Sequence, residues 1–417
     1  AFDRLRISEP ETLFELNATT GKLPFLIDEI ISGAGATSIS NLDNSYISMG
    51  INSSGSGSGT NKVVRQSYEY IPYQPGKSRL IILSGVFESI GGGITGTYER
   101  IGSFDSYSEK SSVTGSGNGC FFELDGKTLY AVIRLNDTAS HNGNTRVAQT
   151  AWSFDKFDGN GPSGLTVNNY STAKILAIDQ EWLGIGQVRF GFFINGQFHV
   201  GHIFNHFDDG ITMPYTKTAK LPIRYEIQGA DNKTAEMRMI CSTILSEGGF
   251  DPTGITYSFG RSTSVTISSN YKPIISIKLR ETEPYNRKTI MLKSIELLNT
   301  QNRGLQWDLV LLPNKTYLTG TPSWTQIDSN NSVAEYDTSA TGISGVTTDL
   351  TSASDSIIVL DSGYADFSST IQFQYDKYLA SPIINSSING DSRVLCLCGV
   401  RLTTDVTTYG SLSWVEV

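Results

Sequence analysis

Three of the four histidines in this sequence fall within eight residues, at His199, His202 and His206. Neutral imidazole is a common ligand of zinc and other transition metals, so this cluster is a candidate metal site. The surrounding residues predict a strand, on which His199 and His202 would lie on opposite faces. One metal ion could then bind both only if a β-bulge intervened. Packed or interface histidines are the other interpretation, and we prefer it.

A second candidate is the acidic, turn-rich segment 154–164, which reads FDKFDGNGPSG and contains Asp155, Asp158 and Asn160. Carboxylate and amide oxygens bind Ca²⁺, but the segment lacks the spacing of an EF-hand loop. Asp155 and Asp158 could also be a glycosidase carboxylate pair, which requires a separation across a cleft that a sequence does not give. Asx turns, in which these side chains accept backbone N–H groups, explain the same residues.

Trp152 and Trp182 flank this region and could stack on sugar rings. Both are equally suited to the core of a β-sandwich, where a large ring needs no ligand, and the core is the interpretation we favour. Trp152, Asp155, Asp158 and Asn160 together form the candidate set for contact with a glycan or with another subunit.

The other segments that resemble nucleotide-binding or catalytic motifs lack a residue or an element that the motif requires. Residues 75–78 (PGKS) resemble the end of a phosphate-binding loop, but Ile71 stands where its first glycine belongs. Residues 91–96 (GGGITG) precede a strand-like segment and not the helix that would bind a phosphate. The sequence contains neither a Gly-x-Ser-x-Gly elbow nor a His-Glu-x-x-His motif. We therefore predict no catalytic residue, no cofactor and no metal.

The four cysteines predict buried thiols. Cys120 and Cys241 are isolated, while Cys396 and Cys398 form a Cys-x-Cys pair. On a strand that spacing places both thiols on one face, where a mutual disulfide is disfavoured and further metal ligands are lacking nearby. Small hydrophobic packing is the expected role.

The charge and the apolar content of the sequence restrict the classes of partner that the protein could bind. The formal net charge is −9, which argues against nucleic acid, and no apolar run is long enough to cross a bilayer. The first ten residues are charged and lack the apolar segment of a signal peptide. Assembly in the cytosol is the simplest expectation, without membrane insertion.

The elements predicted are strands throughout. The sequence has 41 Gly, 19 Tyr and 19 Phe and no convincing helical periodicity, so it indicates an all-β protein. Asn195-Gly196 separates the β-rich runs 188–194 and 197–204 and predicts a type I′ hairpin. With the run 173–186 these make three strands that we expect at the centre of an antiparallel sandwich. A second hairpin is predicted at Asp125-Gly126.

The sequence predicts three consecutive parts of the chain. Residues 1–32 are expected to be an extended N-terminal arm, in which Phe2, Leu5 and Ile7 could dock on a neighbouring subunit; a first edge strand is the alternative. Residues 33–250 form a first sandwich and 251–417 a second one. Within the first, the Gly/Ser-rich stretch 33–61 is expected to be a surface loop held by packing or by neighbouring subunits.

Several of these segments together resemble a family of virion structural proteins of tailed bacteriophages, marine phages included. The resemblance rests on AFDRLRISEPETLFE, YQPGKS, WSFDKFDGNGPSG, WLGIGQVRFGFFINGQ, LPIRYEI and ICSTILSEGG, in this order over residues 1–250. The central strands are also similar to concanavalin-like jelly rolls, a scaffold shared by lectins and phage appendages. Residues 251–417 resemble the family only loosely.

The resemblance implies a non-enzymatic protein of the particle, assembled in the host cytoplasm. We expect a tail, fibre or adaptor protein that forms a symmetric oligomer, most simply a homotrimer, with other virion proteins as partners. The alternatives are a capsid decoration protein, or a module that recognises a glycan of the host surface. A polysaccharide-degrading enzyme ranks last, because no catalytic constellation stands out.

Overall fold

The chain forms two compact units, residues 1–251 and 252–417. The computed structural model describes residues 10–87, 94–110, 117–135, 144–206, 212–250, 254–282, 284–348, 350, 356–366 and 383–417. Within these ranges the protein is all-β, as predicted, and its only helical segments are single 3₁₀ turns. These turns are η1 Ala18–Thr20, η3 Gln149–Ala151, η4 Tyr285–Arg287 and η5 Lys315–Tyr317. No helix in the described ranges has the length and apolar character needed to cross a bilayer.

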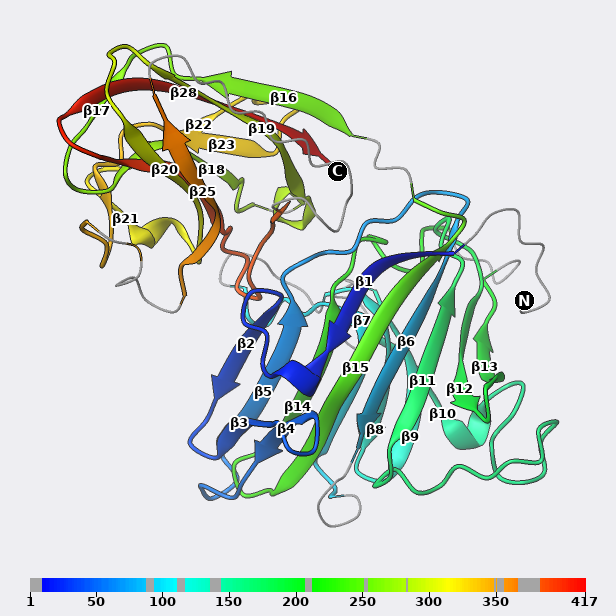
Figure 1. The fold of residues 1–417 in the computed structure, drawn as a ribbon. Helices are drawn as coiled ribbons and strands as arrows, with labels where there is room; N and C mark the ends of the chain where they lie inside the picture. The colour runs from blue at the N-terminus through cyan, green and yellow to red at the C-terminus, as the bar shows by residue number, and fades with distance from the viewer. Residues whose placement is uncertain are drawn as a thin grey trace. The chain divides into compact units, whose positions relative to one another are not determined.

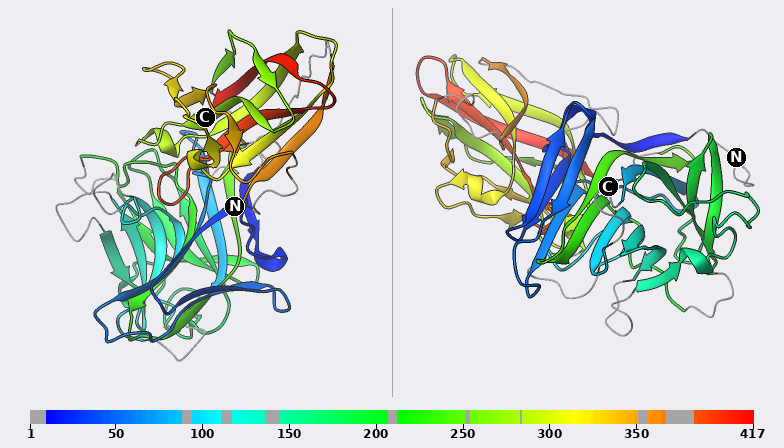
Figure 2. Two further views of the ribbon diagram at one scale, coloured as in Figure 1. Left: turned by 90° about the vertical axis from the view of Figure 1, so that its left-hand side faces the viewer. Right: turned by 90° about the horizontal axis from the view of Figure 1, so that it is seen from below.

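Unit 1 is a sandwich of two antiparallel sheets, which Figures 1 and 2 show as two layers. Sheet I has the strand order β13-β12-β11-β6-β15-β4-β3, and β1 pairs with the C-terminal half of β15. Its strands are β1 Glu11–Asn17, β3 Ala36–Asn41, β4 Tyr46–Ile51, β6 Ser78–Val86, β11 Lys174–Gln180, β12 Val188–Ile194, β13 Gln197–Phe204 and β15 Ala235–Glu247.

Sheet II has the order β10-β9-β8-β7-β14-β5-β2. Its strands are β2 Ile27–Ser32, β5 Thr60–Ser67, β7 Thr97–Phe104, β8 Gly119–Asp125, β9 Thr128–Arg134, β10 Asn144–Ala148 and β14 Ile223–Ala230. The two sheets therefore end in β13 and β10 on one side and in β3 and β2 on the other.

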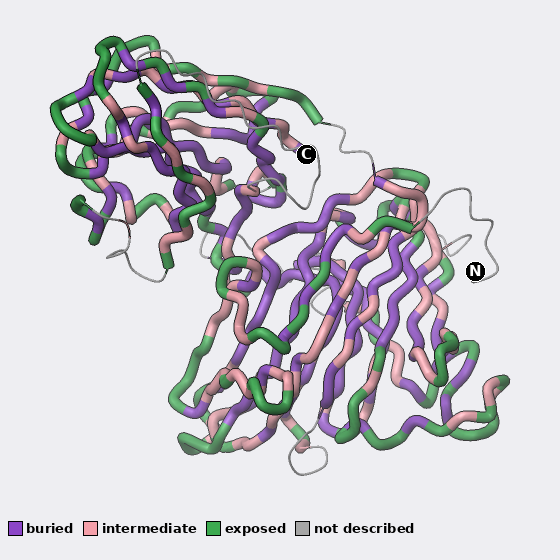
Figure 3. Tube along the Cα trace, viewed as in Figure 1, coloured by how far each residue is buried: buried purple, intermediate pink, exposed green. Residues whose placement is uncertain are grey.

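The core of unit 1 lies between the sheets, and buried residues follow the strands of both (Figure 3). Phe122 of β8 packs edge-on against Phe190 of β12, with 5.1 Å between ring centroids. The hydroxyl of Tyr225 on β14 donates to the carbonyl of Ser84 on β6, at 3.2 Å. Burying a large apolar side chain stabilises a fold by about 1.5–3 kcal/mol, so this aromatic layer is a main source of cohesion between the sheets.

Both predicted hairpins of unit 1 form. Asn195 and Gly196 have φ of 52° and 78°, as the type I′ turn between β12 and β13 requires. The second hairpin turns one residue later than predicted, at Gly126 and Lys127, because β8 includes Asp125. The expectation that 173–204 forms the centre of the sandwich is wrong, since β11, β12 and β13 end sheet I and β13 is its edge strand.

The N-terminal part of the chain also differs from expectation. Residues 10–32 are not a separate arm: β1 pairs with β15 and β2 pairs with β5, so both strands belong to the sandwich. The predicted anchors Phe2, Leu5 and Ile7 lie outside the described residues. The stretch 33–61 contains β3 and β4, and its remaining loop is held by unit 1 itself: Gly57 and Gly59 donate their N–H groups to the carboxylate of Asp231.

Unit 2 contains two larger sheets and a two-stranded ladder. The first has the order β16-β28-β19-β26 with β17 beside β28, and the second has the order β22-β23-β18-β27-β20-β25. Their strands are β16 Ile255–Gly260, β17 Val265–Ile267, β18 Lys272–Leu279, β19 Ile290–Asn299, β20 Leu305–Leu312, β22 Thr325–Gln326, β23 Ala334–Asp337, β25 Ile358–Ala365, β26 Ile383–Ile384, β27 Val394–Arg401 and β28 Val406–Glu416; β21 Leu318–Thr319 pairs with β24 Gly342–Ile343.

Strand β27 separates two apolar clusters of unit 2. Leu395 and Leu397 belong to the larger cluster with Trp307 and Trp414, whereas Cys396 and Cys398 face a smaller one. Both thiols are fully buried on one face of the strand, and all four cysteines of the chain are free. Cys396 and Cys398 pack as small apolar side chains, as the Cys-x-Cys spacing predicted, whereas Cys241 is only partly buried.

Candidate functional site

The segment 152–164 is fastened to β13 at one glycine. The carbonyl of Gly201 accepts the N–H groups of both Phe154 and Asp155, at 3.0 and 2.9 Å. Gly201 is the extra residue of a β-bulge, because Phe190 pairs with His202 while Gly191 pairs with Val200. A Cβ on Gly201 would lie 2.3 Å from Cε3 of Trp152, so a glycine is needed for this close approach.

Trp152 is buried, with 2% of its surface exposed. Its ring lies 6.0–6.3 Å, centroid to centroid, from Phe122, Phe157 and Phe192, and its Nε1 donates to the carbonyl of Val147 at 3.1 Å. The ring is therefore a core element and is not available to stack on a sugar. Trp182 is half-buried and donates its Nε1–H to the hydroxyl of Thr216, at 2.8 Å.

Asp155 holds the acidic segment together from within. Its carboxylate accepts the N–H groups of Phe157 and Ser163, at 2.8 and 2.9 Å. Burial acts to raise the pKa of Asp155, but the hydrogen bonds from Ser163 and Phe157 outweigh it and hold the pKa below its ordinary value. Asp158 accepts the N–H of Asn160 at 2.9 Å in an Asx turn, and both of these residues are exposed. Of the four candidate contact residues, only Asp158 and Asn160 are open to a partner.

The histidines are engaged separately. Because of the bulge at Gly201, His199 and His202 share one face of β13, contrary to the alternation expected from sequence. Nδ1 of His202 accepts the N–H of Ser153 at 3.2 Å, and burial lowers the pKa of this histidine to about 4. No group of three His, Cys, Asp or Glu side chains in the described ranges is placed to hold a metal ion.

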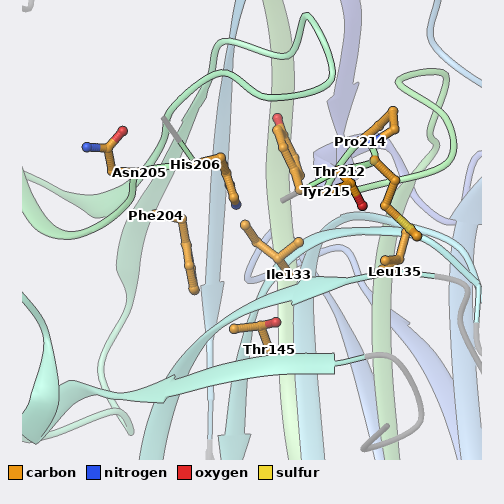
Figure 4. Close-up of a pocket in the computed structure, with 10 residues that line it drawn as sticks. Ile133, Leu135, Thr145, Phe204, Asn205, His206, Thr212, Pro214 and Tyr215 are labelled. Carbon is orange, nitrogen blue, oxygen red and sulfur yellow. The ribbon is translucent and has the colours of Figure 1, made fainter. Parts of the chain in front are cut away.

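A cavity of about 550 Å³ opens between the edge strands β10 and β13, beyond the end of the histidine cluster (Figure 4). It is lined by the ends of β9, β10 and β13 and by the segment 212–215. The lining residues are Ile133, Leu135, Thr145, Phe204, Asn205, His206, Thr212, Met213, Pro214 and Tyr215. We call this space the edge cavity.

No charged side chain is among the lining residues that the structure describes. Ile133, Phe204 and Tyr215 are buried, while Thr145, Asn205, Thr212 and Met213 are exposed around the opening. The rings of His206 and Tyr215 stack at 4.3 Å and 9°. Burial raises the pKa of Tyr215 well above its ordinary value, so the phenol stays neutral at physiological pH. The arrangement suits an uncharged ligand that is partly apolar and partly hydrogen-bonding.

Sequence reasoning missed this cavity. Its lining comes from four stretches between Ile133 and Tyr215, and the sequence pattern presents His206 only as a partner of His199 and His202. Only tertiary pairing brings the ends of β9, β10 and β13 together, and no local motif signals it.

The outward face of sheet II carries a chain of ion pairs. Arg100 bridges two carboxylates, those of Glu123 (Nε to Oε2, 2.6 Å) and Glu226. Nε of Arg224 donates a hydrogen bond to Oε2 of the same Glu226, at 2.9 Å. Burial acts to raise the pKa of Glu226, but the charges of Lys62, Arg224 and Arg100 outweigh it and hold the pKa well below its ordinary value. Glu226 is therefore ionised at neutral pH and is unsuited to be the proton-donating acid of a glycosidase.

No protein-family model matches this chain, and no curated protein matches it either. Solved structures that are similar include an endo-1,3-β-glucanase from Streptomyces sioyaensis (9% identity, 59% of this chain and 99% of the other, TM-score 0.39). Peanut lectin (12% identity, 57% and 98%, TM-score 0.32) and a carbohydrate esterase of the Shiga toxin-encoding bacteriophage phi24B (13% identity, 57% and 99%, TM-score 0.32) are further examples.

The common feature is the concanavalin-like sandwich of lectins and glucanases, over about half of the chain. The identities are 9–13% and the TM-scores lie below 0.5, so these likenesses carry nothing about ligand or reaction. The two-sheet sandwich of unit 1 is established by the strand ladders of this chain itself.

Proposed function

We propose that this protein is a non-enzymatic structural component of a tailed-bacteriophage particle and that it self-associates through strands β2 and β3 of unit 1. The particle is suggested by the sequence segments that resemble tailed-phage virion proteins. The self-association is supported by one structural observation, the exposed apolar side chains of residues 25–42. These are Phe25, Ile31, Ile39 and Leu42, each 46–59% exposed.

Both strands are edges. β3 ends sheet I and β2 ends sheet II, and the two lie on the same side of the sandwich. Soluble monomers protect such edges with charges, prolines or bulges, because unpaired N–H and C=O groups invite another strand. β3 reads ATSISN and has neither a charge nor a proline. β2 reads IDEIIS and carries two carboxylates, so β3 is the unprotected edge. With the exposed apolar side chains beside it, the β3 edge fits a contact with a second copy of the chain.

The oligomer that we propose is a trimer located on the tail or its appendages. In a trimer with three-fold symmetry the contact is heterologous, so the β2–β3 side of one copy meets a different surface of the next copy. Strand pairing between two β3 edges would instead give a two-fold dimer. The mass of the assembly therefore distinguishes the two arrangements.

The test is light scattering of the purified chain at several concentrations, with one variant and one matched control. The wild type is expected near three times 45.5 kDa. Ile39→Lys places a charge on the β3 edge and should yield monomers. Ile175→Lys is the control, because Ile175 is also exposed on the outer face of sheet I (47% against 58% for Ile39) but lies on the inner strand β11. A monomeric wild type, or equal effects of both variants, would refute the proposed contact.

A further inference from the structure

The edge cavity has no part in the proposed self-association, because it lies on the β10–β13 side of unit 1, away from β2 and β3. We propose that it binds a neutral sugar residue, such as the end of an uncharged glycan chain. This inference goes beyond the assembly role and does not depend on it. A volume of about 550 Å³ is within the range of small-ligand sites, roughly 300–1,000 Å³.

The first argument is charge. Among the described residues, the lining contains no Asp, Glu, Lys or Arg. A charged ligand would lose its hydration there without gaining an opposite charge, which costs more than its remaining contacts return. A neutral ligand has no such cost. Acidic sugars are therefore expected to bind worse than neutral sugars of the same size.

The second argument is the pairing of apolar and polar groups. Ile133 and Phe204 offer an apolar surface to the C–H face of a sugar ring. Thr145 and Thr212 add two hydroxyls at the opening. A hydroxyl group both donates and accepts hydrogen bonds, and so do the hydroxyls of a sugar. A purely apolar ligand would form no hydrogen bond with these two hydroxyls.

The third argument is a fixed acceptor. Nδ1 of His206 lies 2.8 Å from the carbonyl oxygen of Gly186, which can only accept, so Nδ1 carries the proton. In the neutral ring Nε2 is then an acceptor, and it has no partner among the described residues of the chain. The stack on Tyr215 holds the ring in place. His206 thus offers a preorganised acceptor to a sugar hydroxyl at the cavity wall.

The experiment is saturation-transfer NMR of the full chain with methyl glycosides of glucose, galactose, mannose and N-acetylglucosamine, and with glucuronic acid and sialic acid as charged comparisons. We expect at least one neutral glycoside to bind with a dissociation constant in the millimolar range, and neither acid to do so. Met213→Trp should block the opening and weaken binding by at least about tenfold. Met213 is exposed, so this substitution should not affect folding.

Phe154→Ala is the matched control, since Phe154 is an exposed aromatic side chain outside the cavity. It should leave the binding unchanged. Thr145→Val, which removes one hydroxyl at constant shape, should weaken binding by a smaller factor. The inference is overturned if no neutral glycoside binds, if an acidic sugar binds as well as a neutral one, or if Met213→Trp binds like the wild type. Because the mass of the oligomer is measured separately, failure here leaves the assembly proposal intact, and the reverse also holds.

Discussion

Substitution of Trp152 tests most directly whether the aromatic layer of unit 1 is a core or a binding surface. Trp152→Ala removes a side chain that is 2% exposed and packs on three phenylalanine rings. Replacing a buried Trp or Phe by Ala typically costs about 3–5 kcal/mol. The carbonyl of Val147 also loses its indole donor, a cost already contained in that range. A loss of this size is a large part of the stability of a domain, which is about 5–15 kcal/mol in total.

Hydrogen exchange followed by mass spectrometry on the full chain resolves the effect by unit. The peptides of β8 and β12 should exchange at least about 100-fold faster in Trp152→Ala than in the wild type, because every 1.4 kcal/mol is a factor of about ten. The peptides of β27 in unit 2 are the internal standard. Phe154→Ala is the matched control, because Phe154 lies two residues away and is 54% exposed. If both substitutions changed the exchange of β8 equally, the assignment of Trp152 to the core would be wrong.

Three further outcomes are expected. Gly201→Ala should lower the melting temperature of unit 1, since the new Cβ would lie 2.3 Å from Trp152 and overpacking costs about 1–3 kcal/mol; an unchanged melting temperature would contradict this packing. Asp155→Asn should destabilise unit 1 at neutral pH. The folded-state pKa of Asp155 is lower than its unfolded pKa of about 4. The stability that the ionised Asp155 contributes is therefore fully present above the unfolded pKa and is lost as the pH falls through the folded pKa. The difference in melting temperature between wild type and variant should shrink towards about pH 2.5. Asp231→Ala should speed proteolysis within residues 53–59, because the Asp231 carboxylate accepts the N–H groups of Gly57 and Gly59 in that loop. The melting temperature should stay nearly unchanged. Equal proteolysis of variant and wild type would show that other contacts fix the loop.

The features predicted correctly from the sequence are those with a local cause. Asn195-Gly196 forms the predicted turn because positive φ is a property of the two residues themselves. The Cys-x-Cys pair lies on one face of β27 because strand periodicity is local as well. The Asx turn at Asp158 likewise depends on a side chain and a backbone N–H two residues away.

The features that were missed or wrong depend on contacts between distant segments. Nothing near β13 in the sequence shows that this strand is an edge, or that its bulge receives Trp152 from nearly fifty residues upstream. The sequence predicts an arm where β1 lies because the partner of this strand, β15, follows more than two hundred residues later. The edge cavity is a product of the same long-range pairing and has no signature in any single segment.

The bulge at Gly201 connects the two parts of the site. Along an uninterrupted β13, the face shared by His199 would continue through residues 201 and 203, and Phe204 would point away from the sandwich. The extra residue shifts this alternation, so His202 pairs with Phe190 and Phe204 pairs with Val188 on the inner face. The glycine that accommodates Trp152 therefore also turns Phe204 into the wall of the edge cavity. Deleting Gly201 removes one residue and with it the bulge, so regular pairing would still place His202 opposite Phe190 and Phe204 opposite Val188. The deletion should therefore disrupt the packing of Trp152 and leave the cavity wall in place, whereas Met213→Trp should weaken the binding alone.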